Sequence, residues 1–243
     1  MKLFNLIITF LIVLVFSFSC EEKKVEKIEF DAEIETTEKK IDSTLIELVD
    51  LPYRIDSTNY IIHIKGFLNK QTRNKYISWS YSSDEDYYNN SSVSYYDRHN
   101  YIFSGNITNV KCQQVNSTKL IQLTDKKIVI NSIEYLKSIN KQIDRQILLY
   151  HVHDMDTNKD KKINSLDIES LYISNIDGTN FMKLSTKYHQ LLDWKIIVEN
   201  STLYFRSKED INQNGKFELS DKIHYQFINL SEKQWKVQSY NPL

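Results

Sequence analysis

The feature that most constrains the fold is an internal repeat in the C-terminal half of the 243-residue chain. Asp156 and Asp210 lie 54 residues apart, and this spacing aligns a twelve-residue polar loop and both of its flanks without a gap. Residues of matching type then fall together: Tyr150 with Tyr204, Ile163 with Phe217, Asp167 with Asp221, Ile173 with Phe227 and Asn175 with Asn229. A fixed internal period indicates a structural unit that occurs more than once.

The segments that flank the two loops have the residue types of β-strands. The loops are preceded by Ile147–His153 and Leu203–Arg206, and they are followed by Leu171–Ser174 and Ile223–Ile228. These segments are rich in β-branched and aromatic residues, and no helical period precedes either loop. We therefore expect each loop to join two antiparallel strands.

A third, weaker copy of the unit lies upstream and lacks the polar loop. The segment Val115–Thr124 aligns with Ile176–Ser185, and more loosely with Leu230–Ser239. The shared unit is therefore predicted to be a strand pair with a turn, into which a loop is inserted twice.

Each loop carries oxygen-bearing side chains at the positions that a calcium ion requires, because Ca²⁺ takes about six to eight hard oxygen ligands. The candidate ligands of loop one are Asp156, Asn158, Asp160, the backbone carbonyl of Lys162, Asn164 and Asp167. Those of loop two are Asp210, Asn212, Asn214, the backbone carbonyl of Lys216, Glu218 and Asp221. The loops resemble the calcium loops of EF-hand and dockerin-type proteins, which implies one or two structural Ca²⁺ ions.

The two loops differ in the glycine position and in charge. Lys161 occupies the sixth position of loop one, where loop two has Gly215, and a residue other than glycine rarely adopts a positive φ. Loop one balances three carboxylates with three lysines, whereas loop two sets three carboxylates against Lys216 alone. Loop two is predicted to be the more electronegative site. The alternative is that both loops are turns, which Asp, Asn and Gly also favour.

The N-terminus has the order of an export signal. Lys2 is followed by an apolar run over Leu3–Phe16, which predicts a cleaved signal peptide over residues 1–19. Ser19 before Cys20 resembles the end of bacterial lipoprotein signals, and the stretch from Cys20 to Lys24 resembles surface-exported lipoproteins of the Bacteroidetes. The resemblance implies a lipid on Cys20 and an outer-membrane location, either periplasmic or surface-exposed. An uncleaved anchor and ordinary secretion are the alternatives.

The mature chain divides into a tether and one domain. Residues 20–44 are highly charged with little apolar surface, which predicts a flexible tether. Residues 45–243 are predicted to form an all-β domain, with the repeats clearest over about 100–185 and 186–243. Cys112 is the only cysteine besides Cys20, so no disulfide is expected within an exported, lipidated chain.

The turn of the repeat carries a further resemblance. Leu171–Ser185, with its Asp177-Gly178 turn, resembles the TolB-type, WD40-like propeller repeat. The resemblance implies antiparallel meanders arranged as propeller-like blades, in a complete or incomplete ring, with the two calcium loops as inserts. It also implies a binding or scaffolding role. A β-sandwich is the alternative fold.

Other patterns are weaker. His151, His153 and Asp154 could bind a transition metal, but the sequence offers no third partner for them, so we expect exposed strand histidines instead. The tryptophans at 79, 194 and 235 are expected to pack in the protein rather than to hold a glycan.

Charge and motifs restrict the function. The net charge of −1 gives no field that would attract nucleic acid, and the chain has no phosphate loop, nucleophile elbow or zinc-protease helix. We therefore expect no enzymatic activity and no nucleic-acid partner, but a lipid-anchored, calcium-binding protein with an unknown protein or glycan ligand. One alternative is an accessory hydrolase or carbohydrate-binding protein with structural calcium and active residues within 45–100. The other is a structural envelope protein without metal.

Overall fold

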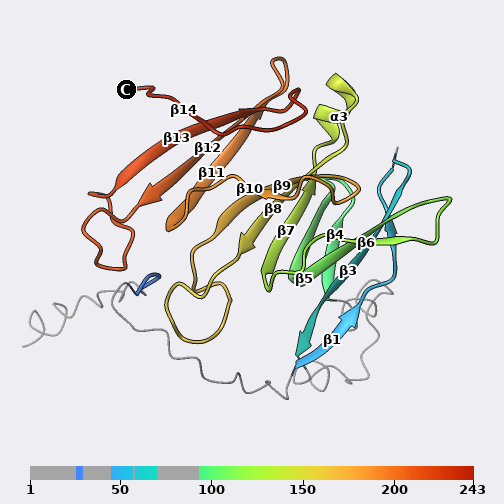
Figure 1. Ribbon diagram of the computed structural model, residues 1–243, viewed down its shortest axis with the longest axis horizontal. Coiled ribbons are helices and arrows are strands. Elements are labelled where there is room, and N and C mark those ends of the chain that lie inside the picture. The colour runs from blue at the N-terminus through green and yellow to red at the C-terminus, as the bar shows by residue number, and fades with distance from the viewer. Residues whose placement is uncertain (1–25, 30–44, 57, 70–92) are drawn as a thin grey trace, which may run out of the picture.

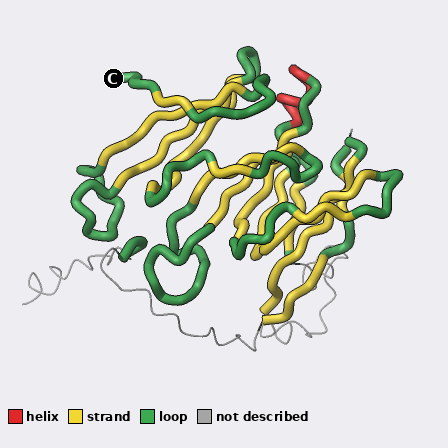
Figure 2. Tube along the Cα trace, viewed as in Figure 1, coloured by secondary structure: helices red, strands yellow, loops and turns green. Residues whose placement is uncertain are grey.

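The fold was analysed in a computed structural model that describes residues 26–29, 45–56, 58–69 and 93–243. In these residues the chain forms two antiparallel β-sheets, neither of which closes on itself, and one short helix, α3 (Lys137–Ile143). Figure 1 shows the two sheets side by side, and Figure 2 shows how little helix the chain contains. The predicted all-β class is confirmed.

The larger sheet has the strand order β1-β3-β5-β7-β8-β9-β10, with β2 paired to β3 and both β4 and β6 paired to β5. Its strands are β1 (Leu45–Val49), β2 (Tyr53–Arg54), β3 (Tyr60–Asn69), β4 (Ser94–Asp97), β5 (Ile102–Gln114), β6 (Leu120–Gln122), β7 (Val129–Tyr135), β8 (Ile147–His153), β9 (Ser170–Asn175) and β10 (Met182–Lys183). The smaller sheet is a meander of β11 (His189–Ile197), β12 (Thr202–Glu209), β13 (Lys222–Asn229) and β14 (Gln238–Ser239).

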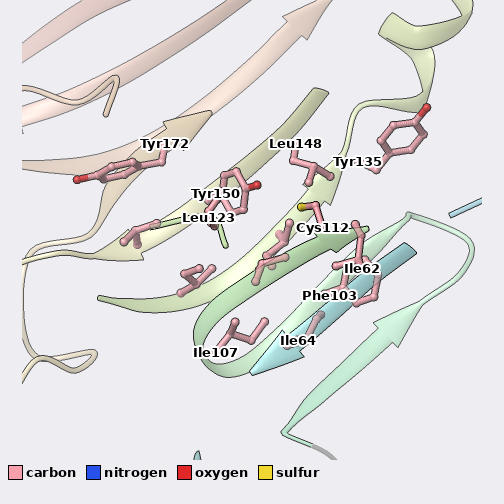
Figure 3. Close-up of a cluster of buried hydrophobic side chains, with 14 of the residues drawn as sticks. Ile62, Ile64, Phe103, Ile107, Cys112, Leu123, Tyr135, Leu148, Tyr150 and Tyr172 are labelled. Atoms are coloured by element: carbon pink, nitrogen blue, oxygen red, sulfur yellow. The ribbon is translucent and has the colours of Figure 1, made fainter. Parts of the chain in front are cut away.

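The first hydrophobic core lies on one face of the larger sheet. Ile62 and Ile64 of β3 pack with Phe103 of β5 and Tyr150 of β8, and all four side chains are excluded from water (Figure 3). The free thiol of Cys112 lies in the same core, where burial raises its pKa to about 12. A neutral thiol behaves here as a small apolar side chain.

Strands β8 and β9 are buried on both faces. Alternate residues of β8 point in opposite directions, so Tyr150 enters the first core while Leu149 enters a second core with Leu203 and Phe205 of β12. The second core therefore holds the smaller sheet against β8 and β9. Trp194 and Trp235 pack in or against it, as predicted. Trp79 lies outside the described residues.

The backbone around the two loops follows the 54-residue alignment in strand pairing and in one turn. β8 pairs with β9 across loop one and β12 pairs with β13 across loop two, both antiparallel. Each of the three copies then makes the same turn, in which a backbone N–H donates to the carbonyl three residues earlier. These bonds run from Ser117 to Gln114, from Gly178 to Asn175 and from Glu232 to Asn229, at 2.9, 3.0 and 3.3 Å.

In the described part of the chain no helix is long and apolar enough to cross a membrane. The predicted signal peptide over residues 1–19 and the predicted lipidation site at Cys20 lie outside the described residues.

Candidate metal sites

The two predicted calcium loops share one unusual backbone. Residues at the fourth position, Lys159 and Gln213, have φ of 57° and 56°. Residues at the sixth position, Lys161 and Gly215, have φ of 69° and 78°. Lys161 thus adopts the left-handed conformation that glycine provides in loop two, although a β-carbon makes that conformation costly.

Backbone N–H groups hold the polar side chains of both loops in place. In loop one the side-chain oxygens of Asn158, Asp160 and Asn164 each accept an N–H from two residues ahead, at 3.1, 2.8 and 2.7 Å. In loop two Asn212 and Asn214 do the same, at 3.0 and 2.8 Å. Each oxygen has a second lone pair that a cation can use. The same bonds also occur in ordinary turns, so they do not by themselves identify a metal site.

The two loops differ in the hydrogen bonds of the aspartate at their twelfth position. Asp167 is fully buried, and its Oδ1 accepts from the N–H groups of Thr157 and Asn158 at 2.7 and 3.3 Å, while its Oδ2 accepts from the N–H of Asn164 at 2.9 Å. Asp221 is only 6% exposed, and its Oδ2 accepts from the N–H of Glu218 at 2.6 Å. Its Oδ1 is buried and has no hydrogen-bond partner.

The first position is also turned toward the loop interior. In loop two the carboxylate of Asp210 is 6% exposed and accepts the N–H of Gly215 at 2.8 Å and that of Asn214 at 3.3 Å. In loop one Asp156 is half-buried. The remaining carboxylates are more exposed: Asp160 faces solvent and Glu218 is half-buried.

The carboxylates of each loop do not gather around one centre. Among the described residues, the one group of three or more His, Cys, Asp or Glu side chains with ligand atoms within 4.8 Å of one another consists of His189, Glu209 and His224. The loops therefore present their oxygens in the predicted order, but a bound ion would have to draw those oxygens closer together.

A short segment from the predicted tether connects the two loops. Residues 26–29 lie between them, as the blue segment in Figure 1 shows. The N–H of Lys27 donates to the carbonyl of Gly215 at 2.7 Å, and the N–H of Glu29 donates to the carbonyl of Thr157 at 2.9 Å. Ile28 between them is 3% exposed. At these four residues the predicted tether is packed against the domain, and the rest of residues 20–44 lies outside the described residues.

The segment approaches loop two closely enough to require a glycine. A β-carbon on Gly215 would stand 2.4 Å from the carbonyl oxygen of Ile28. On the other side, the hydroxyl of Thr157 donates to the carbonyl of Lys27 at 2.6 Å. Both loops therefore bind the same short segment through backbone groups.

The possible transition-metal ligands His151 and Asp154 are used in other interactions. Trp194 donates its Nε1–H to Nε2 of His151 at 2.9 Å, and Nδ1 of His151 lies 3.1 Å from the carboxylate of Glu169. Both ring nitrogens of His151 are thus engaged. Asp154 forms an ion pair with Lys183 at 2.8 Å.

His153 is buried rather than exposed. It is 2% exposed, and its ring nitrogens contact the Asn131 side chain at 2.8 Å and the carbonyl of Ile168 at 3.2 Å. Burial is the main cause that lowers its pKa, so the ring is held neutral. His151, His153 and Asp154 therefore form part of a polar network between the sheets and do not converge on a metal.

The group formed by His189, Glu209 and His224 has no signal in the linear sequence. Each residue lies on a different strand of the smaller sheet, and no motif spacing joins them. Only the strand register brings them together, with His189 opposite Glu209 and His224 opposite Ser207.

No protein-family model and no curated protein matches this chain.

Proposed function

We propose that the protein is a calcium-stabilised all-β binding module, held at the bacterial cell envelope by a lipid on Cys20, with loop two as its main calcium site. The observation that carries the calcium assignment is Asp221. A buried carboxylate oxygen without a hydrogen bond is unfavourable, and bound cations are a common reason for such a group. Asp221 stands at the twelfth position, which supplies the last ligand of a calcium loop.

Backbone N–H groups of loop two already hold several of the side-chain oxygens that would bind calcium. Asp210 is buried, Asn212 and Asn214 are exposed, and all three accept N–H groups of the loop through their side-chain oxygens. A modest contraction of the loop would bring these oxygens and Asp221 around one ion. Because loop two also has the larger negative charge, it should fill before loop one.

The ion has a structural role in this proposal. Loop two holds Lys27 through the carbonyl of Gly215, and loop one holds Glu29 through the carbonyl of Thr157. Calcium that rigidifies the loops would therefore also fix residues 26–29 to the domain. Since Glu26 is only six positions after Cys20, the loop end of the domain would lie within about 20 Å of the lipid.

We also propose that the three copies of strand, turn and short strand are degenerate blades of a propeller-like array. The matched turn bonds after β5, β9 and β13 support a common origin of the copies. The array is open, and its exposed sheet faces would be available for binding a protein or glycan.

The calcium proposal is tested by thermal unfolding of the chain with calcium and with a chelator. At calcium about ten times the dissociation constant, one site adds about 1.4 kcal/mol, which raises the melting temperature by about 3–6 °C. Asp221→Asn should remove most of this rise, and the double variant Asp156→Ala, Asp210→Ala should remove all of it. The matched control is Asp125→Asn, an exposed acid in a turn outside the loops. An unchanged rise in Asp221→Asn would place the ion elsewhere.

Lipidation is tested separately. Cells grown with a radiolabelled fatty acid should label the wild-type chain and not the Cys20→Ser variant, which should also leave the membrane fraction. Equal labelling of both chains would refute the anchor without affecting the calcium proposal.

A glycan-binding role is the second candidate, because one observation favours it. The rings of Tyr204, Tyr225, Phe227 and Tyr240 gather on the outer face of the smaller sheet, with neighbouring centroids 5.6–5.9 Å apart. Aromatic faces of this kind can stack on sugar rings. Oligosaccharide binding that is lost in Tyr204→Ala and kept in Asp221→Asn would assign the ligand to this face.

A further inference from the structure

We infer that His189, Glu209 and His224 form a binding site for a divalent transition metal of the zinc type, separate from the calcium loops. The site has three protein ligands and leaves a further coordination position open. It lies at the end of the smaller sheet where loop two begins and ends.

The strand register places the three side chains on one face. His189, the first residue of β11, is the cross-strand partner of Glu209, the last residue of β12. His224 of β13 is the partner of Ser207, which lies two residues before Glu209. Because side chains two residues apart on a strand share a face, as do direct cross-strand partners, all three project from the same side.

The distances suit a single ion. The ligand atoms of the three residues lie within 4.8 Å of one another, and Nε2 of His224 is 2.7 Å from Oε2 of Glu209. Metal–nitrogen and metal–oxygen bonds of about 2.0–2.2 Å are needed for zinc, so an ion between the three groups would replace the His224–Glu209 hydrogen bond with two coordination bonds.

The surroundings orient His189. Its Nδ1 lies 3.4 Å from the hydroxyl of Ser207, and that hydroxyl lies 3.3 Å from Oε1 of Gln226. If the ring donates Nδ1–H to Ser207, Nε2 carries the lone pair for a metal. A hydrogen bond to the second ring nitrogen is the usual way in which proteins fix a histidine ligand.

The ligand chemistry selects the metal. Two imidazoles and one carboxylate favour zinc and related first-row ions over Ca²⁺ or Mg²⁺, which prefer oxygen alone. His189 is 9% exposed, whereas His224 and Glu209 are half-buried, so the open position faces solvent. Lys222 is the cross-strand partner of Glu209, and its positive charge would repel a bound metal ion. It is exposed, so its long side chain can extend into solvent away from the site.

The test is zinc titration of the full-length chain, purified without a histidine tag and with calcium in excess to occupy the loops. Isothermal titration should find one equivalent of Zn²⁺. His189→Ala and His224→Ala should each weaken binding by more than about tenfold, since even loss of an outer hydrogen-bonding partner of a metal ligand costs about 10–100-fold. The exposed His99 supplies the matched control, and His99→Ala should bind as the wild type does.

A second variant keeps the test decisive if an alanine variant unfolds. Glu209→Gln retains the shape of the side chain and a hydrogen bond to His224, yet it should also weaken zinc binding. Co²⁺ in place of Zn²⁺ should give the visible absorption of a low-coordinate site, and this band should vanish in Glu209→Gln. Zinc binding that is absent from the wild type, or that is equal in the wild type and the His189 and His224 variants, would overturn the assignment.

Discussion

Lys161 and Gly215 adopt the same left-handed backbone conformation at the sixth position of loops that lie 54 residues apart, with φ of 69° and 78°. Only Gly215 does so without a β-carbon, so loop one carries strain that loop two avoids. The common backbone at this position agrees with the 54-residue alignment of the two loops.

The first prediction concerns a substitution that removes the backbone strain at Lys161. Lys161→Gly should raise the free energy of unfolding by about 0.5–1 kcal/mol, because relief of a left-handed β-carbon exceeds the entropy that glycine adds to the unfolded chain. Urea unfolding in a chelator measures the change without any contribution from calcium. Lys162→Gly is the control, because Lys162 does not have a positive φ and should lose stability instead. Equal effects at the two positions would show that Lys161 is not strained.

The second prediction concerns the contact between loop two and residues 26–29. Gly215→Ala would place a β-carbon 2.4 Å from the carbonyl oxygen of Ile28, so the segment should leave the loop. Hydrogen exchange should then show loss of protection at the amide of Lys27, which donates to Gly215. Gly178→Ala is a matched control, since Gly178 also has a positive φ but its nearest neighbour would be 3.7 Å away. Unchanged protection at Lys27 in Gly215→Ala would contradict the packed segment.

Sequence alone predicted the parts of the fold that depend on local pattern. The 54-residue period, the strands on both sides of Asp156 and Asp210, and the Asp177-Gly178 turn all follow from residue types at fixed spacing. Residues 26–29 were expected to be part of a flexible tether because their charge pattern offers little apolar surface. Their packing depends on Ile28 and on backbone groups, whose partners a linear pattern does not reveal.

The candidate metal ligands also differ in whether the sequence alone can identify them. The loop ligands follow one another within twelve residues, so their spacing can be recognised in the sequence. His189, Glu209 and His224 come from three strands, and their proximity depends on the pairing of His189 with Glu209 and on the register of β13. The spacing of His151 and His153 makes them candidates in the sequence. In the structure the ring nitrogens of His151 contact Trp194 and Glu169, and a ring nitrogen of His153 contacts Asn131.

The third prediction is a pH dependence from His153. Burial lowers its pKa in the folded state, while the unfolded side chain has a pKa of about 6.5. Below that pH the unfolded chain binds a proton that the folded chain resists, so stability should fall as the pH drops from about 6.5 toward the folded pKa, and it should be unaffected above about 7. His153→Gln should lose less stability than the wild type between about pH 7 and 5. Urea unfolding at both values measures this difference, and parallel losses would refute the role of His153.

The last prediction compares how the two aspartates at the twelfth position, Asp167 and Asp221, contribute to stability. Asp167 accepts N–H groups through both oxygens, so Asp167→Ala leaves several donors of the loop unpaired and should cost about 2–4 kcal/mol even in a chelator. Asp221 accepts a hydrogen bond from the N–H of Glu218 through Oδ2, and its buried Oδ1 has no hydrogen-bond partner. Asp221→Ala should therefore cost little in a chelator and should mainly remove the stabilisation by calcium. Urea unfolding of both variants, with calcium and with a chelator, gives the comparison. If the two variants lose the same stability in a chelator, Asp221 serves as a hydrogen-bond acceptor in the same way as Asp167. That result would contradict the assignment of calcium to loop two.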